Sequence, residues 1–175
     1  ANKGRAYLRC ANHRKCGFFT WADGKSSKIT PSWQRFHGIQ LVTDAGFAAS
    51  DLKQGRLGSC WFLSALAVVA ERHDLIARLF IDTKYNKKGI YGLRFFLDGK
   101  WRAVFVDNQL PTYQERPAYC RCYDSTTSRP TLWASLAEKA YAKAHGSFRA
   151  ISGGQISEAL RDLTGAACVC IDLPR

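Results

Sequence analysis

The stretch that most constrains the fold runs from Gln54 to Ala70, where a turn with two glycines leads into Cys60 and an almost unbroken apolar run. The run spans several helical turns and is apolar on every side, which predicts a buried α-helix beginning near Cys60. Free N–H groups and the positive dipole end would stabilise a thiolate in its first turn. The glycines permit a sharp reversal that would bring the Gln54 amide beside the sulfur, forming half of an oxyanion hole. The alternative is that Cys60 is a small core residue, which is the commoner case for a lone cysteine beside an apolar helix.

The segment 54–61 reads Gln-Gly-Arg-Leu-Gly-Ser-Cys-Trp and resembles the Q-G-x-L-G-D-C-W signature of calpains, the papain-like cysteine proteases. Ser59 stands where that family usually has Asp; because both can cap a helix, we expect Ser59 to change only the local charge. Residues 132–147 also resemble the family, with apolar positions at helical spacing and Gly146 as the C-cap. Residues 89–106 predict a β-hairpin that turns at Asp98-Gly99.

The resemblance covers roughly residues 40–170, the first half of a calpain core, and within the family it is most similar to the small-optic-lobes type. It implies an α+β fold, the mainly helical half of a papain-like core with a small β-hairpin. It also implies that Cys60 attacks a peptide carbonyl while Gln54 and the Cys60 N–H hold the oxyanion. The catalytic His and Asn are expected downstream of residue 175, so we expect this chain alone to be an inactive fragment. The histidines at 37, 73 and 145 are not expected to serve as the base; His37 is expected to be a surface or packing residue.

The loop from Asp44 to Asp51 contains two carboxylates and a bend at Gly46, which suits a hard cation but more often reflects turn chemistry. Calpains bind one Ca²⁺ in this half, so the resemblance implies main-chain oxygens near Asp44 and Gly46, with carboxylates from Asp51 and Glu138, as ligands. Glu138 lies on the apolar stripe of its helix, and the alternative for it is an ion pair with Lys139 or a neighbouring residue.

Residues 1–24 contain a second pattern around Cys10 and Cys16. The alternating and aromatic residues on either side predict two short strands, and the two thiolates would supply half of a tetrahedral zinc site. The order of residues resembles the back half of a GRF zinc finger, as seen in Gly4-Arg5, Cys10, Cys16, Phe18-Phe19, Trp21 and Asp23. The other two zinc ligands are expected before Ala1. That family binds single-stranded nucleic acid, which fits basic side chains between aromatics; the aromatics could equally form the module's small core.

Charge and cysteine usage bound the remaining possibilities. The chain has 175 residues and a formal net charge of +12. Its first 40 residues contain eight of the basic residues and one Asp. This asymmetry is consistent with an anionic partner, nucleic acid first among the candidates, and equally with a solvated surface whose lysines serve solubility. The seven cysteines do not form an even disulfide framework, and we expect reduced thiols in an intracellular, cytoplasmic protein. No apolar stretch is long enough to span a membrane. The predicted division is a partial finger at 1–24, a linker at 25–39 and the protease half at 40–175.

These observations predict an intracellular, calcium-regulated, calpain-like cysteine endopeptidase that acts on protein substrates. The alternative is a non-enzymatic nucleic-acid-binding scaffold with a degenerate protease domain. Ser59 and Asn108 allow that alternative because each replaces an Asp of the family pattern.

Overall fold

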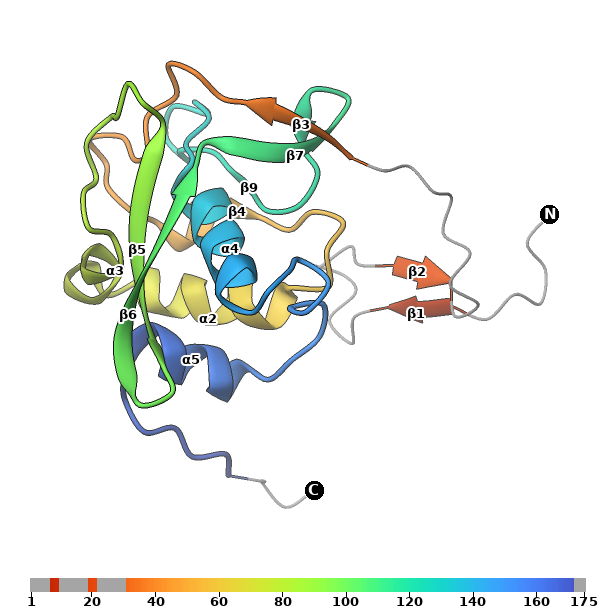
Figure 1. Ribbon diagram of the computed structural model, residues 1–175, viewed down its shortest axis with the longest axis vertical. Helices are drawn as coiled ribbons and strands as arrows, with labels where there is room; N and C mark the ends of the chain where they lie inside the picture. The colour runs from red at the N-terminus through yellow and green to blue at the C-terminus, as the bar shows by residue number, and fades with distance from the viewer. Residues whose placement is uncertain (1–6, 10–18, 22–30, 172–175) are drawn as a thin grey trace.

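The computed structural model describes residues 7–9, 19–21 and 31–171 (Figure 1). The helices are α2 (Cys60–Ala70), α3 (His73–Leu79), α4 (Trp133–Ala144) and α5 (Ile156–Thr164), with a 3-10 turn η1 (Ala49–Asp51). The strands are β1 (Tyr7–Arg9), β2 (Phe19–Trp21), β3 (Ser32–Arg35), β4 (Leu52–Lys53), β5 (Ile90–Leu97), β6 (Lys100–Asp107), β7 (Gln109–Tyr113), β8 (Arg116–Pro117) and β9 (Arg121–Cys122). Helices and strands are mixed, which agrees with the predicted α+β class. None of these helices is long and apolar enough to cross a membrane.

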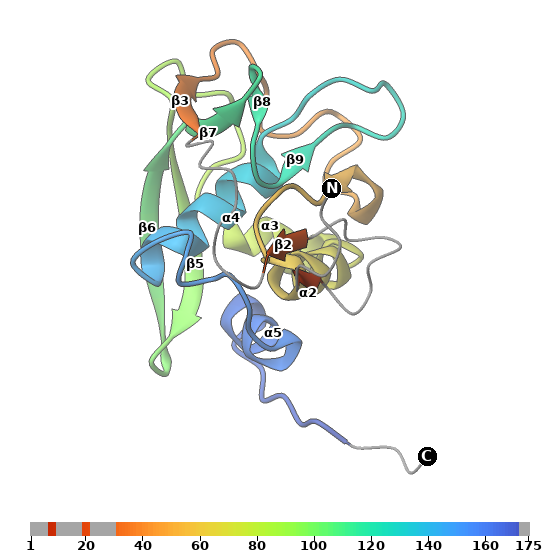
Figure 2. The same ribbon diagram turned by 90° about the vertical axis from the view of Figure 1, so that its right-hand side faces the viewer.

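Helix α4 lies at the centre of the fold, with the β5–β6 hairpin along one side and α2 along another (Figures 1 and 2). Tyr141 lies on the apolar stripe of α4, is fully buried and contacts both neighbours. The Tyr141 ring stacks on Phe62 of α2 with centroids 4.3 Å apart and meets Phe95 of β5 edge-on at 5.4 Å. Aromatic pairs of this kind contribute about 0.5–1.5 kcal/mol beyond their buried area. Tyr141 therefore links α2 to the hairpin.

The β5–β6 hairpin has the predicted turn. Leu97 pairs with Lys100, and the two residues between them, Asp98 and Gly99, have φ of 52° and 76°. Positive φ at both central positions favours an Asp-Gly pair, since Asp tolerates this region and Gly adopts it freely. The prediction of a hairpin at this sequence is confirmed.

Helix α2 begins at Cys60 as predicted, but it is not buried on every side. Phe62, Leu66 and Val69 are almost completely buried against α3, α4 and α5, whereas Val68 is 60% exposed. Apolar composition all round a helix does not distinguish its buried faces from an open one, so the expectation of complete burial was wrong for the face that carries Val68.

Strand β3 lies within residues 25–39, the stretch predicted to be a linker. It pairs antiparallel with β7, and the sheet order is β3-β7-β8. The Arg35 guanidinium at its end donates to the side chains of Asn108 and Asp107 at 2.9 and 3.0 Å. Residues 32–35 therefore belong to the sheet of the core.

Strands β1 and β2 pair antiparallel with Tyr7 opposite Trp21. The prediction of two short strands in the N-terminal module is confirmed for these residues. Cys10 and Cys16 lie outside the described residues, and the predicted zinc site stays a prediction.

Candidate active site

Cys60 is the first residue of α2 and its side chain is half-buried. At this position the free N–H groups of the first turn and the positive end of the helix dipole favour the thiolate over the thiol. The prediction that the helix begins at the cysteine is confirmed. The structure thus gives Cys60 an environment expected of a reactive thiol.

The turn that precedes Cys60 is fixed against the segment between β8 and β9. A Cβ at Gly55 would lie 1.8 Å from the Tyr119 carbonyl oxygen, so only glycine fits there. The next residue, Arg56, donates its main-chain N–H to the Ala118 carbonyl at 2.9 Å. These two contacts hold the backbone on both sides of the sharp turn.

Gln54 stands at the start of this turn, and its side-chain Nε2 donates to the Leu57 carbonyl. A primary amide has two N–H donors. One of them therefore ties the side chain to its own turn, and the second is the donor that an oxyanion hole would use. The structure orients Gln54 through this bond in a way that the sequence did not indicate.

Ser59 precedes the nucleophile, and its hydroxyl donates to Glu138 Oε1. The Cys120 N–H donates to the other carboxylate oxygen, Oε2, at 2.8 Å. Glu138 is 1% exposed, and burial raises its pKa to about 7 although these two hydrogen bonds lower it. Both carboxylate oxygens thus have partners immediately behind Cys60.

These contacts correct two expectations. Ser59 occupies the N-cap position of α2 but makes no capping hydrogen bond, because its hydroxyl is directed to the buried carboxylate. Glu138 does not pair with Lys139, whose ammonium instead reaches Asp107 at the end of β6. A buried carboxylate needs hydrogen-bond donors more than a helix end does, since an unmatched buried charge is far more costly.

The four residues predicted as calcium ligands each have surroundings of their own. Asp44 is exposed, and the Asp51 carboxylate accepts the Ser125 N–H at 3.0 Å. The Glu138 carboxylate is engaged as described above, and Gly46 lies against the ring of His73. Within residues 31–171 and the two N-terminal strands, no three His, Cys, Asp or Glu side chains are grouped to hold a metal ion. Calcium binding by main-chain oxygens near Asp44 and Gly46 with the carboxylates of Asp51 and Glu138 stays a prediction.

A loop before α5 lies against the nucleophile turn. The Trp61 indole Nε1 donates to the Ile151 carbonyl at 3.0 Å, and the Gly153 N–H donates to the Gly58 carbonyl at 2.9 Å. A Cβ at Gly154 would lie 2.5 Å from the Trp61 ring. Gly153 and Gly154 continue the family pattern in the sequence, but their contacts with the turn before Cys60 were not predicted.

Cys120 and Cys122 are free, as predicted for two reduced thiols, but both are buried. Burial raises the pKa of Cys122 to about 12 and that of Cys120 well above its ordinary value. Both are therefore protonated and unreactive near neutral pH, in contrast to the environment of Cys60.

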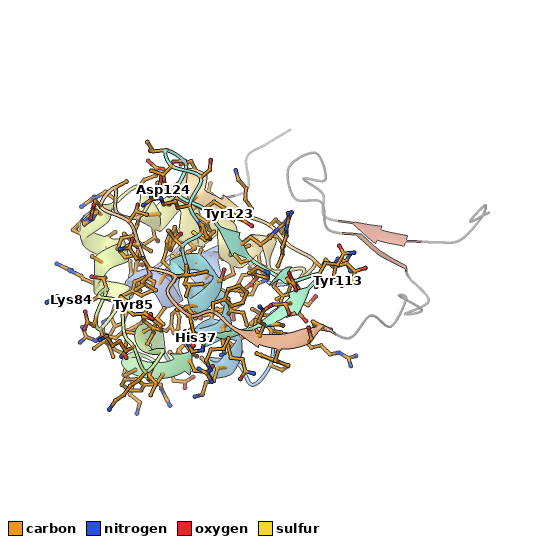
Figure 3. All side chains as sticks on the ribbon, turned by 90° about the horizontal axis from the view of Figure 1, so that it is seen from above. His37, Lys84, Tyr85, Tyr113, Tyr123 and Asp124 are labelled. Atoms are coloured by element: carbon orange, nitrogen blue, oxygen red, sulfur yellow. The ribbon has the colours of Figure 1, made fainter. Side chains whose placement is uncertain are left out.

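The three histidines within residues 31–171 lie in different environments. His37 follows β3 and is exposed (Figure 3), which confirms the expectation of a surface residue. The His73 ring meets Phe47 edge-on with centroids 6.0 Å apart. His145 is the C-cap of α4; its ring is tilted against that of Tyr141 with centroids 4.3 Å apart, and it lies 3.8 Å from the Asp162 carboxylate.

Comparison with known proteins gives the class to which this fold and site correspond. The sequence matches the calpain family cysteine proteases over residues 13–175. It is 46% identical over 126 residues to calpain-type cysteine protease DEK1 of Zea mays, covering 71% of this chain and 6% of that protein. Calpain-A of Drosophila melanogaster is 38% identical over 148 residues, covering 81% of this chain and 17% of the relative. Calpain-5 of Mus musculus is 36% identical over 157 residues, with 82% and 24% covered.

The chain therefore belongs to the calpain family of cysteine proteases. It spans between 6% and 24% of the length of these three relatives. The resemblance to the family is confirmed, whereas the finer likeness to the small-optic-lobes type stays a prediction.

Proposed function

We propose that this chain supplies the nucleophile of a cysteine endopeptidase that cleaves protein substrates. The observation that carries the proposal is the position of Cys60 at the first turn of α2, behind a turn whose backbone is fixed at Gly55 and Arg56. Family membership supports the same chemistry.

In the proposed reaction, the Cys60 thiolate attacks a peptide carbonyl and the carbonyl oxygen becomes an oxyanion. The Cys60 main-chain N–H and the second N–H of the Gln54 amide donate to this oxygen. Collapse of the intermediate breaks the C–N bond, the amine leaves with a proton, and a thioester remains that water then hydrolyses. The proton is carried by a histidine oriented by an asparagine, both proposed to come from a segment outside residues 1–175.

The test uses the longer protein that contains this chain. Cys60→Ala should abolish cleavage of casein, and Gln54→Ala should reduce kcat about 10²–10³-fold, as loss of one oxyanion donor does elsewhere. Cys168→Ala is the matched control, because it removes an exposed thiol and should leave turnover unchanged. Full cleavage by the Cys60→Ala protein would refute the proposal.

Calcium regulation is a separate part of the proposal and rests on the resemblance of residues 44–51 alone. The engaged carboxylates of Asp51 and Glu138 mean that calcium would have to displace existing hydrogen bonds. The test compares casein cleavage in calcium with cleavage in a chelator, for the parent protein and for Asp51→Asn and Glu138→Gln. Equal rates in both solutions would remove the calcium part and leave the proteolytic part intact.

We also propose, as a second function, that the N-terminal module binds single-stranded nucleic acid through a zinc-bound finger. The support is the excess of basic residues in the first 40 positions, eight against one Asp. A gel-shift with the complete finger should show binding that weakens steeply with salt, because phosphate contacts release counterions. If binding is found and casein cleavage is not, the alternative of a non-enzymatic scaffold is favoured.

A further inference from the structure

A cavity of about 420 Å³ opens beside the turn that precedes Cys60. Gln54 lines it together with three arginines, Arg56, Arg116 and Arg121. No Asp or Glu is among the described residues of its wall. The cavity therefore has a strongly positive lining and shares one residue with the proposed oxyanion hole.

The three arginines come from three segments that the fold brings together. Arg56 belongs to the turn before Cys60, Arg116 begins β8 and Arg121 begins β9. The hydrogen bond from the Arg56 N–H to Ala118 joins the first segment to the others. The Arg56 guanidinium lies 4.0 Å from the centre of the Tyr113 ring, which orients it. Figure 3 shows Tyr113 at the edge of the body, where β7 ends.

The positive charge of this cavity is not neutralised within the part of the chain that the structure describes. None of the three arginines forms an ion pair with a described residue. Arg121 Nε is buried and has no hydrogen-bond partner among these residues. An unmatched buried donor is unfavourable, so the fold retains a donor that a bound acceptor would satisfy.

A second, smaller cavity of about 200 Å³ shares Arg116 and Arg121 with the first. Glu115 lies in its wall, yet Glu115 makes no ion pair with either arginine. The nearest acid on the same hairpin therefore leaves both guanidinium groups available to a ligand.

We propose that the cavity is a substrate subsite that takes the carboxylate of an Asp or Glu side chain. This inference rests on the proposed proteolytic function. A peptide whose scissile carbonyl reaches Gln54 passes the cavity within a few residues, because an extended chain advances about 3.3 Å per residue. Arginine matches a carboxylate with two parallel N–H donors, which gives both affinity and orientation.

The first experiment measures binding without turnover. The Cys60→Ala form of this chain, labelled with ¹⁵N, is titrated with end-blocked Ala-Glu-Ala, with end-blocked Ala-Gln-Ala and with inorganic phosphate. We expect the Glu peptide to shift the Arg121 Nε–H resonance and to bind about tenfold more tightly than the Gln peptide, as expected for one charge-assisted hydrogen bond. Arg116→Gln and Arg121→Gln should remove the difference. Arg94→Gln, an exposed arginine on β5 outside the cavity, should retain it.

Equal binding of the two peptides would overturn the inference. A response to phosphate alone would also overturn it, because the cavity would then be a site for a phosphate group. Protein melts of each variant, recorded in parallel, separate a lost site from a lost fold.

The second experiment measures cleavage by the longer protein with a peptide library in which one Glu or Gln is placed at successive positions. We expect one position near the cut to favour Glu about tenfold, and Arg121→Gln to abolish the preference while cleavage of the Gln peptides continues. Cleavage without an acidic preference would refute the subsite and leave the proteolytic function standing. Absence of all cleavage would refute the proteolytic function, and the cavity would then not be a substrate subsite even if the tripeptides differ.

Discussion

Gly55, Ser59 and Gly154 are small residues that hold the nucleophile turn in place, each through a contact with a distant segment. Gly55 lies against the Tyr119 carbonyl and Gly154 against the Trp61 ring. Ser59 donates to Glu138, which is 79 positions away in the chain. The geometry around Cys60 therefore depends on residues whose side chains are too small to interfere, or are polar enough to satisfy a buried charge.

Gly55→Ala should disturb the turn before Cys60, because its new Cβ would meet main-chain atoms of Tyr119 that cannot rotate away. We expect a loss of about 1–3 kcal/mol in the free energy of unfolding, the usual range for overpacking. Turnover by the longer protein should fall as well, because Gln54 moves with the turn. Gly38→Ala is the control: no atom lies within 4 Å of its Cβ position, so only the strain of its positive φ should appear. Urea unfolding measures both, and a fully stable, active Gly55→Ala protein would contradict the expectation.

Ser59→Ala should destabilise the fold by about 1–3 kcal/mol, because it removes one of the donors to a buried carboxylate. Glu138→Gln removes the charge that needs this donor, so adding Ser59→Ala to Glu138→Gln should cost much less. A double-mutant cycle by urea unfolding gives the coupling energy, which we expect to be about 1 kcal/mol or more. Ser64→Ala, on an exposed face of the same helix, serves as the matched control. Additive losses would show that the hydroxyl and the carboxylate act independently.

The position of Cys60 at the start of a helix could be predicted because the turn, the helix and the signature all lie within residues 54–70. Its supporting contacts could not, since Glu138, Tyr119 and Ile151 reach the site only through the folded chain. The capping prediction for Ser59 failed for the same reason. Ser59 occupies the N-cap position that the sequence predicts. Its hydroxyl, however, donates to the buried Glu138, which only the tertiary structure brings close.

At the scale of elements, α4 is fastened to the end of β6 by Lys139. Its ammonium donates to the Gln109 carbonyl at 2.6 Å, to the Asp107 carbonyl at 2.9 Å and to the Asp107 carboxylate. Arg35 at the end of β3 reaches the same carboxylate at 3.0 Å. Asp107 thus joins a helix and two strands at one point.

Because of the Asp107 contacts, the free energy of unfolding should decrease as the pH falls through the acid range. Burial raises the pKa of Asp107, but hydrogen bonds and charge from Lys139, with a further hydrogen bond from Arg35, outweigh it and hold the pKa below 3.8. The unfolded state therefore binds the proton more readily, so the contribution is present above about pH 4 and is lost as pH falls through the lowered pKa. The carboxylate is 35% exposed, and screening limits the effect to about 1 kcal/mol.

Asp107→Asn should lower Tm at pH 7, and the difference from the parent protein should shrink between pH 4 and pH 2. Thermal melts across this range measure it. Asp98→Asn removes the exposed pair with Arg102 at the hairpin turn and should change Tm little at any pH. If the Tm difference between Asp107→Asn and the parent protein stays constant down to pH 2, the titration of Asp107 does not contribute to stability.

The helices and strands differ in how clearly the sequence predicts them. The hairpin β5–β6 and the helix α4 have clear periodicity with Asp-Gly or Gly punctuation, and both were predicted. Strand β3 has no buried side chain, so it shows no alternating pattern and was taken for a connector. Its place in the sheet comes from main-chain pairing with β7, which hydrophobic patterning does not reveal.

For the whole molecule, these pairings define where the core begins. Strands β1 and β2 pair with each other, whereas β3 pairs with β7 of the core. The Ser32 and Thr112 hydroxyls are 3.0 Å apart across that pair, and Arg35 adds its contacts with Asn108 and Asp107. We therefore expect the boundary between the N-terminal module and the protease half to lie before Ser32, within the stretch predicted as a linker.

Two deletions test this boundary. Removing residues 1–30 should leave the Tm of the remaining chain within about 2 °C, because it leaves β3 and all its partners intact. Removing residues 1–39 should lower Tm by several degrees, since β7 loses its neighbour and both Asp107 and Asn108 lose the Arg35 guanidinium. The matched variant Arg35→Gln in the shorter deletion separates the side-chain part of this loss from the main-chain part. Equal melting of the two deleted chains would place the start of the core after residue 39, and a large loss from the first deletion would make the N-terminal module part of the same folding unit.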